Sequence, residues 1–338
     1  MLHCVDSEIE AIEYAYNQGW TDGLPVVLPT QDRVDEVLSR WGYDAGEEVG
    51  RVPERHRIIT AEMVAANLVM AGGIPDMFPV ILASVEAILD DRYNIVGPSA
   101  STGGAAPLIM VHGPVVETLE FNTGTAVLGA GNRANLTAGR ALNLIIRNAV
   151  GSIPGALDQA TLAHAGRIAY CLPEGETGVW PSQGKEIGVP EGASAVSVFA
   201  AEAPHSVADH AHNEPDGLID SFARIILATH YTGAAIVVLI CPEHRAVFQH
   251  AGWSKNEIRQ ALFDVTRITG HEVRRTGRHD HITSDETLSI VPARDDIWII
   301  CGGGTAGGHS AIIPPWLGSD RGEGSRTVTK GVGVCLDC

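Results

Sequence analysis

The chain has 338 residues, 45% hydrophobic and 19% charged, which is enough apolar material for one large domain or two closely packed ones. Its formal net charge is −18 and it has no basic run, so a nucleic-acid partner is not expected. No stretch reaches the roughly 20 apolar residues of a membrane span, and the first ten residues do not resemble a secretory signal. We therefore expect a cytoplasmic protein without a membrane partner, with its cysteines mostly reduced.

Helix signals are clear along the first half of the chain. Ser7 to Glu10, and later Ser254 to Glu257, carry the pattern of a capping box, in which a hydroxyl and a carboxylate satisfy free N–H groups of a first turn. A helix is predicted between a Thr30 cap and a Gly42 stop, and another after Thr60. Two further apolar stretches predict helices over residues 78–89 and 134–151.

Strands are predicted at four short apolar runs, over residues 107–112, 195–201, 235–241 and 296–301. Both faces of these runs are apolar, as in parallel strands covered by helices, so we expect an α/β fold with mainly parallel sheets in two closely packed lobes. A stretch rich in Gly, Pro and Glu suggests the boundary. The predicted organisation is an N-terminal α/β lobe (1–171), a connecting segment (172–194), a C-terminal α/β lobe (195–330) and a flexible tail (331–338).

Two glycine-rich turns are candidates for ligand loops, because ligands of open α/β sheets sit beyond the carboxyl ends of strands. Gly129 and Gly131 precede a helix whose start could bind a carboxylate or phosphate, unless the turn is structural. The second turn, over residues 301–310, holds five glycines, which indicates close backbone approach to a ligand or to another strand. The predicted substrate-binding residues of the two turns are Asn132, Arg133, Asn135, Gly303, Gly304, His309 and Ser310.

A histidine cluster follows the strand 195–201 and contains His205, Asp209, His210 and His212. On a helical turn His205 and Asp209 would share a face, and imidazole with carboxylate can hold a divalent ion such as zinc or iron. All four residues are therefore candidate metal ligands. Without a metal, His205, Asp209 and His210 could transfer protons. The third interpretation is a helix cap and a polar loop.

The cysteines are the candidates for nucleophilic or redox chemistry, because the thiolate is the reactive form and helix N-termini lower its pKa. Cys241 ends a strand just before a helix, and Cys301 ends a strand before the glycine turn; either could also be a small buried apolar residue. Cys171 lies beside the predicted connecting segment. Cys335 and Cys338 form a terminal C-x-x-C pair that could exchange with a disulfide involving Cys171, or could hold sulfur or metal for delivery.

Five segments together resemble poorly characterised bacterial proteins associated with the UGSC family of (seleno)proteins. The segments are "WTDGLPVVLPT", "GNRANLTAGRAL", "APHSVADH", "PEHRAVFQHAGWSK" and "GGGTAGGHSAIIPPW". The resemblance implies thiol or selenol chemistry related to reductive cleavage of a carbon–heteroatom bond. Cys335 and Cys338 match the two ends of the U/C-G-S-C motif, with Leu336 and Asp337 in place of Gly-Ser.

The sequence thus predicts a thiol-dependent oxidoreductase or lyase acting on a small, anionic organic molecule. The predicted catalytic residues are Cys335, Cys338, Cys171, His205, Asp209 and His210. One alternative is a metal-dependent hydrolase or lyase that uses the histidine cluster, and another is a carrier that delivers sulfur or metal from the C-terminal pair. A thiol reductant or sulfur-accepting protein is the expected macromolecular partner, and a homo-oligomer is compatible with these functions.

Overall fold

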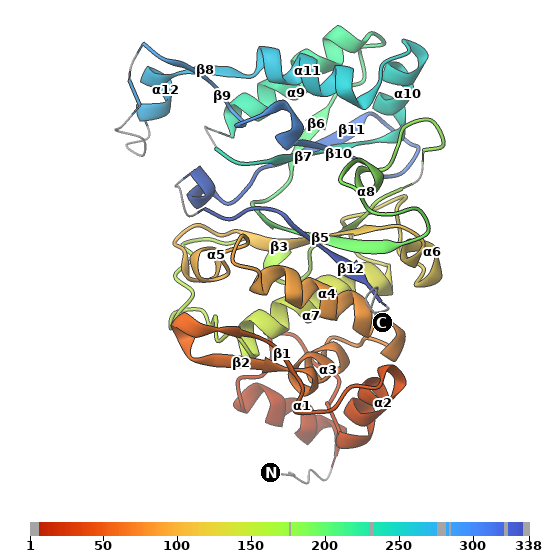
Figure 1. Cartoon of the computed structure of the whole chain (residues 1–338), viewed down its shortest axis with the longest axis vertical. Coiled ribbons are helices and arrows are strands. Elements are labelled where there is room, and N and C mark those ends of the chain that lie inside the picture. The colour runs from red at the N-terminus through yellow and green to blue at the C-terminus, as the bar shows by residue number, and fades with distance from the viewer. Residues whose placement is uncertain are drawn as a thin grey trace.

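The computed structural model describes residues 7–175, 177–229, 233–275, 282–283, 285–320 and 324–333. Two four-stranded sheets lie face to face, and helices cover the outer face of each (Figure 1). The described part of the chain is therefore a mixed α/β structure of four layers, in the order helices, sheet, sheet, helices. Among its helices none is long and apolar enough to cross a membrane.

The first sheet has the order β12-β5-β3-β4 and the second the order β10-β7-β11-β6. The strands of the first are β3 (Ala106–His112), β4 (Cys171–Pro173), β5 (Ser194–Ala201) and β12 (Val328–Val332). Those of the second are β6 (His205–Ala208), β7 (Ile236–Ile240), β10 (Ile297–Cys301) and β11 (His309–Ile313). The four runs predicted to be strands are all strands: β3, β5, β7 and β10.

The prediction of mainly parallel sheets is wrong for the described residues. Only β3–β4 and β7–β10 pair in parallel, and the remaining pairings within the two large sheets are antiparallel. The strands are apolar on both faces because one face packs on helices and the other on the opposite sheet. Burial on both faces therefore does not reveal strand direction.

Helices cover the two outer faces (Figure 1). On the side of the first sheet lie α1 (Glu8–Asn17), α2 (Gln31–Trp41), α3 (Ala61–Met70), α4 (Phe78–Leu89) and α7 (Arg133–Asn148). On the side of the second lie α9 (Pro215–Ala228), α10 (Pro242–His250) and α11 (Lys255–Val265). The predicted caps are confirmed for α2, which ends at Gly42 with a φ of 71°, and for α11, which begins with the Ser254–Glu257 capping box.

Shorter elements fill the connections. The short helices are α5 (Val96–Ala100), α6 (Val115–Thr118), α8 (Gln183–Glu186) and α12 (Gly270–Arg274), and the 3-10 turns are η1 (Pro53–Arg55), η2 (Pro75–Met77), η3 (Ala165–Arg167), η4 (Arg294–Asp296) and η5 (Leu317–Asp320). Two hairpin-like pairs are formed by β1 (Glu48–Val52) with β2 (Arg57–Thr60) and by β8 (Arg267–Thr269) with β9 (Thr287–Ser289).

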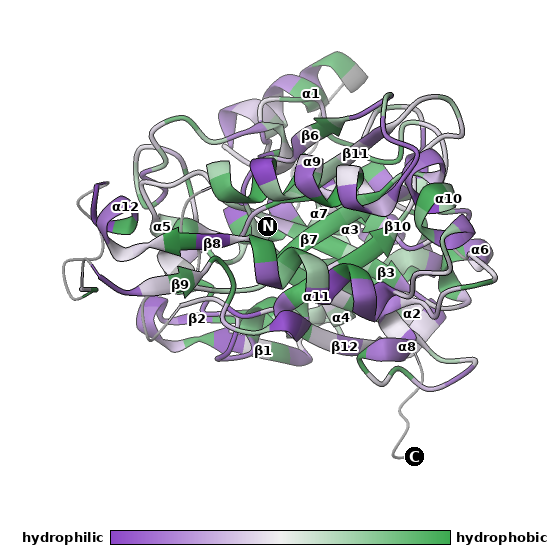
Figure 2. Ribbon diagram, turned by 90° about the horizontal axis from the view of Figure 1, so that it is seen from above, coloured by the Kyte–Doolittle hydropathy of each residue, from purple (hydrophilic) through white to green (hydrophobic). Residues whose placement is uncertain are grey.

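The side chains of each strand alternate between two cores. In β3, Ile109 and Val111 pack toward the helices, whereas Leu108 and Met110 pack between the sheets. In β7 the same alternation sends Val238 to the helical side and Leu239 to the layer between the sheets. Seen from above and coloured by hydropathy, the strands β3, β7 and β10 are mostly hydrophobic (Figure 2), and nearly all of their residues are buried.

The segment 172–194, predicted to connect two lobes, does not separate the two sheets. Nearly all of β5 lies in the predicted C-terminal lobe, and β12 runs from that lobe into the predicted flexible tail, where Gly331 and Val332 are strand residues. Both strands nevertheless pair within the first sheet. The chain thus passes from the first sheet to the second and returns to complete the first at its end.

Five strands end at one edge of the sandwich. From the pairing directions, β3 and β4 of the first sheet end there, and so do β6, β7 and β10 of the second. Two backbone hydrogen bonds join the loops of the two sheets at this edge: Gly175 N–H donates to the carbonyl of Cys301 (3.0 Å) and Gly303 N–H to that of Thr123 (2.8 Å). Polar residues that follow these strands are consequently brought together.

Candidate functional site

A thiol, an imidazole and a hydroxyl meet where β7 ends and α10 begins. Cys241 is the N-cap residue of α10, and His244 lies in the first turn of the same helix. The backbone N–H of Cys241 donates to Ser310 Oγ (3.0 Å), and His244 Nδ1 lies 2.8 Å from the same oxygen. Ser310 belongs to β11, the strand beside β7. The sheet register therefore places the hydroxyl next to the thiol.

Nε2, the second ring nitrogen of His244, lies 2.9 Å from the carbonyl oxygen of Asp209, and this contact fixes the orientation of the ring. A carbonyl only accepts hydrogen bonds, so Nε2 carries the hydrogen. In the neutral ring Nδ1 is then the bare nitrogen, and it accepts the hydroxyl hydrogen of Ser310. His244 can therefore take a proton on the side that faces the thiol.

The turn that carries the Asp209 carbonyl is itself tightly held. The Asp209 carboxylate contacts His212 Nδ1 (2.8 Å) and Ser221 Oγ (2.5 Å) and accepts the backbone N–H groups of Ala211 and His212. Burial alone would raise the pKa of Asp209, but the bonds from Ser221 and His212 outweigh it and hold that pKa well below its usual range. Asp209 is therefore an ionised residue that positions the backbone around His244.

Gly308 closes the cluster from the other side. A Cβ at this position would lie 2.1 Å from the Asp209 carbonyl oxygen and 2.7 Å from His244 Nε2. Any side chain would push these groups apart, so glycine is required. The close backbone approach predicted for the glycine turn is thus found, and what it approaches is the protein itself.

The surroundings of Cys241 favour its ionised form. Burial raises the pKa of this thiol, but the His244 side chain and the Ser310 hydroxyl outweigh burial and lower the pKa to about 7. For His244 burial acts to lower the pKa, while Cys241 and the Asp209 carbonyl raise it above its ordinary value. Both shifts point to a thiolate–imidazolium pair, the reactive state of a nucleophilic cysteine.

The other predicted thiols lie elsewhere. Cys171 points into the core between the first sheet and its helices, where burial raises its pKa far above that of a free thiol. This hydrocarbon environment contradicts the catalytic role predicted for Cys171. Burial also raises the pKa of Cys301, to about 11. Cys335 and Cys338 lie outside the described residues.

The histidine cluster differs from its prediction in local structure. Residues 205–208 form β6 and not a helical turn, so His205 and Asp209 stand at opposite ends of a strand. The His210 ring lies 4.7 Å from that of His309, centroid to centroid, and both side chains are exposed. Within the described residues no three His, Cys, Asp or Glu side chains are grouped so that they could hold a metal ion. The zinc or iron site stays a prediction that the geometry does not support.

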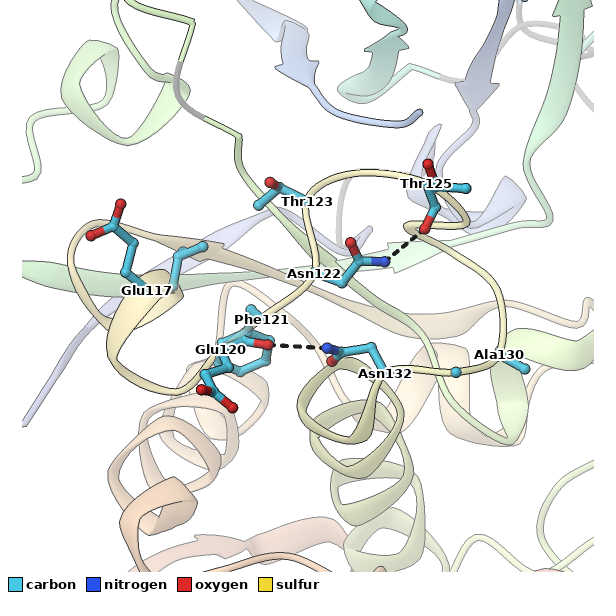
Figure 3. A pocket seen from close by; sticks show the side chains of 10 residues that line it. Glu117, Glu120, Phe121, Asn122, Thr123, Thr125, Ala130 and Asn132 are labelled. Carbon is cyan, nitrogen blue, oxygen red and sulfur yellow. Dashed lines mark hydrogen bonds between the residues drawn. The ribbon is translucent and has the colours of Figure 1, made fainter. Parts of the chain in front are cut away.

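The first glycine turn uses its polar residues for internal bonds. Arg133 donates from Nε and Nη2 to the carbonyl of Gly72 (3.0 and 2.7 Å). The Asn135 amide, which is buried, bonds the backbone of Asn122 and the carbonyl of Val127. Asn132 caps α7 and donates to the carbonyl of Glu120, the bond drawn in Figure 3. These contacts direct the groups predicted to bind an anion toward the protein's own backbone.

A cavity of about 670 Å³ opens beside this turn (Figure 3). Residues of the loop between α6 and α7 line it; Glu117, Glu120, Asn122, Thr123, Thr125 and Asn132 are its polar members. A second cavity of about 380 Å³ shares Glu117 and Thr123 with the first, so the two are adjacent. Both lie next to the strand ends described above.

The second glycine turn lies between this cavity and the thiol. Gly303 is hydrogen-bonded to Thr123, and a Cβ on Gly304 would lie 2.7 Å from Thr125 Oγ1. Gly302 N–H donates to the carbonyl of Ile240, the residue before Cys241 (3.2 Å). The segment 302–308 thus touches the cavity loop at one end and His244 at the other.

No protein-family model matches this chain. No curated protein matches it either. The resemblance to UGSC-associated proteins therefore stays an expectation from sequence, and the function is inferred from the geometry of the site.

A buried ionic network at the same edge was missed by sequence reasoning. His112 joins Glu174 (Nδ1 to Oε2, 3.0 Å) and Ser197 (Nε2 to Oγ, 3.0 Å), and Lys255 Nζ lies 3.7 Å from Glu174 Oε1. Burial would raise the pKa of Glu174, but His112 and Lys255 help to hold it below its ordinary value. The only sequence signal was a polar residue in each of two apolar strands, which does not reveal a partner.

Proposed function

We propose that the protein is a thiol-dependent enzyme that cleaves a carbon–heteroatom bond in a small organic molecule, with Cys241 as the nucleophile and His244 as its proton acceptor and donor. The observation that carries this proposal is the contact of Cys241, His244 and Ser310 where β7 meets α10. The function expected from sequence is retained, but the thiol assigned to it is new.

The chemistry follows from the proton positions. The Cys241 thiol gives its proton to Nδ1 of His244, and the thiolate attacks an electrophilic carbon of the substrate. For a carbonyl substrate the bond from carbon to the heteroatom breaks with its electron pair, and the leaving heteroatom takes the proton from His244. The product is a thioester on Cys241. Water, deprotonated by His244, then releases a carboxylic acid and restores the thiol.

The substrate would lie in the cavity of Figure 3 and reach the thiol past the glycine segment. Only 3% of Cys241 is exposed, so neighbouring residues have to move for a substrate to touch the sulfur. Gly303 and Gly307 have φ values of 105° and 92°, which glycine adopts at little cost. A cavity of several hundred Å³ fits a small organic molecule.

The structure offers little support for the anionic substrate expected from sequence. That expectation depended on Arg133, whose guanidinium is bonded to Gly72. Of the ten residues that line the larger cavity, two are carboxylates, Glu117 and Glu120, and none is Lys or Arg, whereas Lys185 lines the smaller cavity. These lining residues therefore do not favour an anionic substrate over a neutral one.

The test combines labelling with turnover. Iodoacetamide should modify Cys241 with a pH profile whose midpoint is close to 7, measured by mass spectrometry of the Cys241 peptide. A panel of small esters, thioesters and amides should be turned over by the native chain and not by Cys241→Ser. Cys171→Ala is the matched control, since it removes a thiol that the proposal does not use.

Two outcomes would overturn the proposal. One is a labelling midpoint near that of an ordinary thiol. The other is turnover that survives in Cys241→Ser and disappears when Cys335 and Cys338 are both replaced by Ser. The second outcome would return the chemistry to the C-terminal pair.

A further inference from the structure

We propose that Cys241 is also a modification site: hydrogen peroxide oxidises it to a sulfenic acid, with His244 supplying the proton that the reaction consumes. The inference uses the same thiolate as the proposed function but needs no substrate. It would make any activity at Cys241 reversibly sensitive to oxidants.

The step balances with groups already in contact. The thiolate sulfur attacks one peroxide oxygen, an S–O bond forms and the O–O bond breaks. The departing hydroxide takes the proton from the His244 imidazolium and leaves as water. Sulfur loses two electrons, peroxide gains them, and the products are the sulfenic acid of Cys241 and a neutral His244. Peroxide chemistry is slow at thiols that lack such a proton donor, so the position of His244 is the essential feature.

Shielding should make the site selective for small oxidants. Cys241 has 3% of its surface exposed, and the glycine segment 302–308 packs against its neighbours Ile240 and His244. Hydrogen peroxide has two heavy atoms and can pass where a bulky hydroperoxide cannot. The selectivity therefore distinguishes this buried site from an exposed reactive cysteine.

Neither of the other two thiols in the described residues is suited to the same reaction. Cys171 is surrounded by hydrocarbon, and the pKa of Cys301 is raised to about 11, so both are protonated at neutral pH. A protonated thiol also attacks a sulfenic acid poorly. From the described residues, the sulfenic acid of Cys241 should persist long enough to be trapped.

The experiment compares each cysteine in the native chain with the same cysteine in the chain unfolded in urea. The full-length protein is treated with hydrogen peroxide at pH 7 and with dimedone, and the peptides are quantified by mass spectrometry. Cys241 should be oxidised at least about tenfold faster in the native chain, because the proton donor is present only there. Cys171 and Cys301 should be oxidised more slowly in the native chain, as buried thiols are.

His244→Gln is the decisive variant. It should abolish the native-state acceleration even at a pH where the thiol is fully ionised, since the thiolate is then present but the proton donor is not. Cumene hydroperoxide should react with Cys241 more slowly than hydrogen peroxide does. A dimedone adduct at Cys241, or a disulfide that includes it, supports the proposal.

Slower oxidation of Cys241 in the native chain than in urea would overturn the inference. If iodoacetamide labelling still shows a midpoint near 7 in that case, the proposed function survives alone. If the labelling midpoint is that of an ordinary thiol, the thiolate itself is absent and both fail.

Discussion

Cys241 and Cys171 are almost equally inaccessible to solvent, with 3% and 4% of their surfaces exposed, yet the pKa of Cys241 is lowered and that of Cys171 is raised. Cys241 stands at the edge where five strands end, among a hydroxyl, an imidazole and a helix N-terminus. Cys171 begins β4 and lies in the apolar core that includes side chains of β3, β5 and α7. Burial raises the pKa of both thiols, and only at Cys241 do polar partners reverse the effect.

The reactivity of a thiol in this fold therefore depends on the polar groups that face it and not on its position along a strand. Cys301 also ends a strand at this edge, yet burial raises its pKa to about 11, whereas a thiol without polar partners is a small apolar residue. At the end of a strand the backbone turns, and neighbouring strands present their own terminal side chains. Cys241, Ser310 and Asp209 come from three different strand ends of the second sheet.

The largest expected effect is on the free energy of unfolding. It tests whether the buried charges at this edge of the sandwich are stable only because they are paired with one another. Glu174→Gln removes the carboxylate between His112 and Lys255, all three nearly inaccessible. We expect a loss of about 3 kcal/mol in the free energy of unfolding at pH 7, because Lys255 would keep a buried charge with one partner fewer. Urea unfolding measures the loss.

The pH dependence of that loss has a defined sign. The pKa of Glu174 is lowered in the folded protein, so its contribution is complete above the unfolded value of 4.5 and is lost as the pH falls through the folded one. The difference between the native chain and Glu174→Gln should therefore shrink in acid. Asp220→Asn, which removes an exposed ion pair with Arg224, is the control and should leave unfolding unchanged. Equal effects of the two substitutions would contradict the paired-charge interpretation.

The second prediction exchanges the two thiols for hydroxyls. Cys171→Ser puts a hydroxyl into hydrocarbon and should cost about 2 kcal/mol of unfolding free energy. Cys241→Ser should cost less, because His244 and Ser310 can bond the new hydroxyl. Urea unfolding of both variants gives the comparison directly. Equal losses would mean that the polar surroundings of Cys241 do not reach its side chain.

Part of this contrast could be read from the sequence. A cysteine between an apolar strand and a helix start stands where a thiolate could be stabilised, and the structure places Cys241 there, although the sequence allowed a small buried apolar residue equally well. Element types were equally readable, since β3, β5, β7, β10 and the capped helices depend on local patterns. What could not be read is how distant segments pair. Residues 205–208 are a strand because β11, about a hundred residues later, pairs with them.

The same limit explains the errors at the candidate site. Arg133 looks like an anion ligand at a helix start, but its partner is Gly72, on another connection. Glu174 and Lys255 are charged residues that a local reading places in solvent, yet they meet at the edge between the sheets. In the sequence Cys171 lies beside the predicted connecting segment, whereas the β3–β4 pairing places it in the core.

The third prediction concerns the imidazole. In His244→Gln the pKa of Cys241 should return toward its ordinary value of 9.0, so the midpoint of iodoacetamide labelling should rise by about two pH units. At pH 7 the thiolate fraction falls about fiftyfold, but a more basic thiolate is a better nucleophile, so the rate should fall only about sixfold. His250→Gln, at the other end of α10, is the matched control. A midpoint that stays near 7 would exclude His244 as the stabilising group.

The smallest expected effect distinguishes the contribution of the Ser310 hydroxyl to the pKa of Cys241 from that of the His244 imidazole. Ser310→Ala removes the acceptor of the Cys241 N–H and one of the groups that lower the thiol pKa, but leaves His244 held by the Asp209 carbonyl. The labelling midpoint should rise by about half a pH unit, the worth of one modest hydrogen bond. Ser254→Ala, which removes the cap of α11, controls for loss of a serine hydroxyl away from the thiol and should leave the midpoint unchanged. A shift as large as that of His244→Gln would mean that Ser310 orients the imidazole, and that the Asp209 carbonyl alone cannot hold it in place.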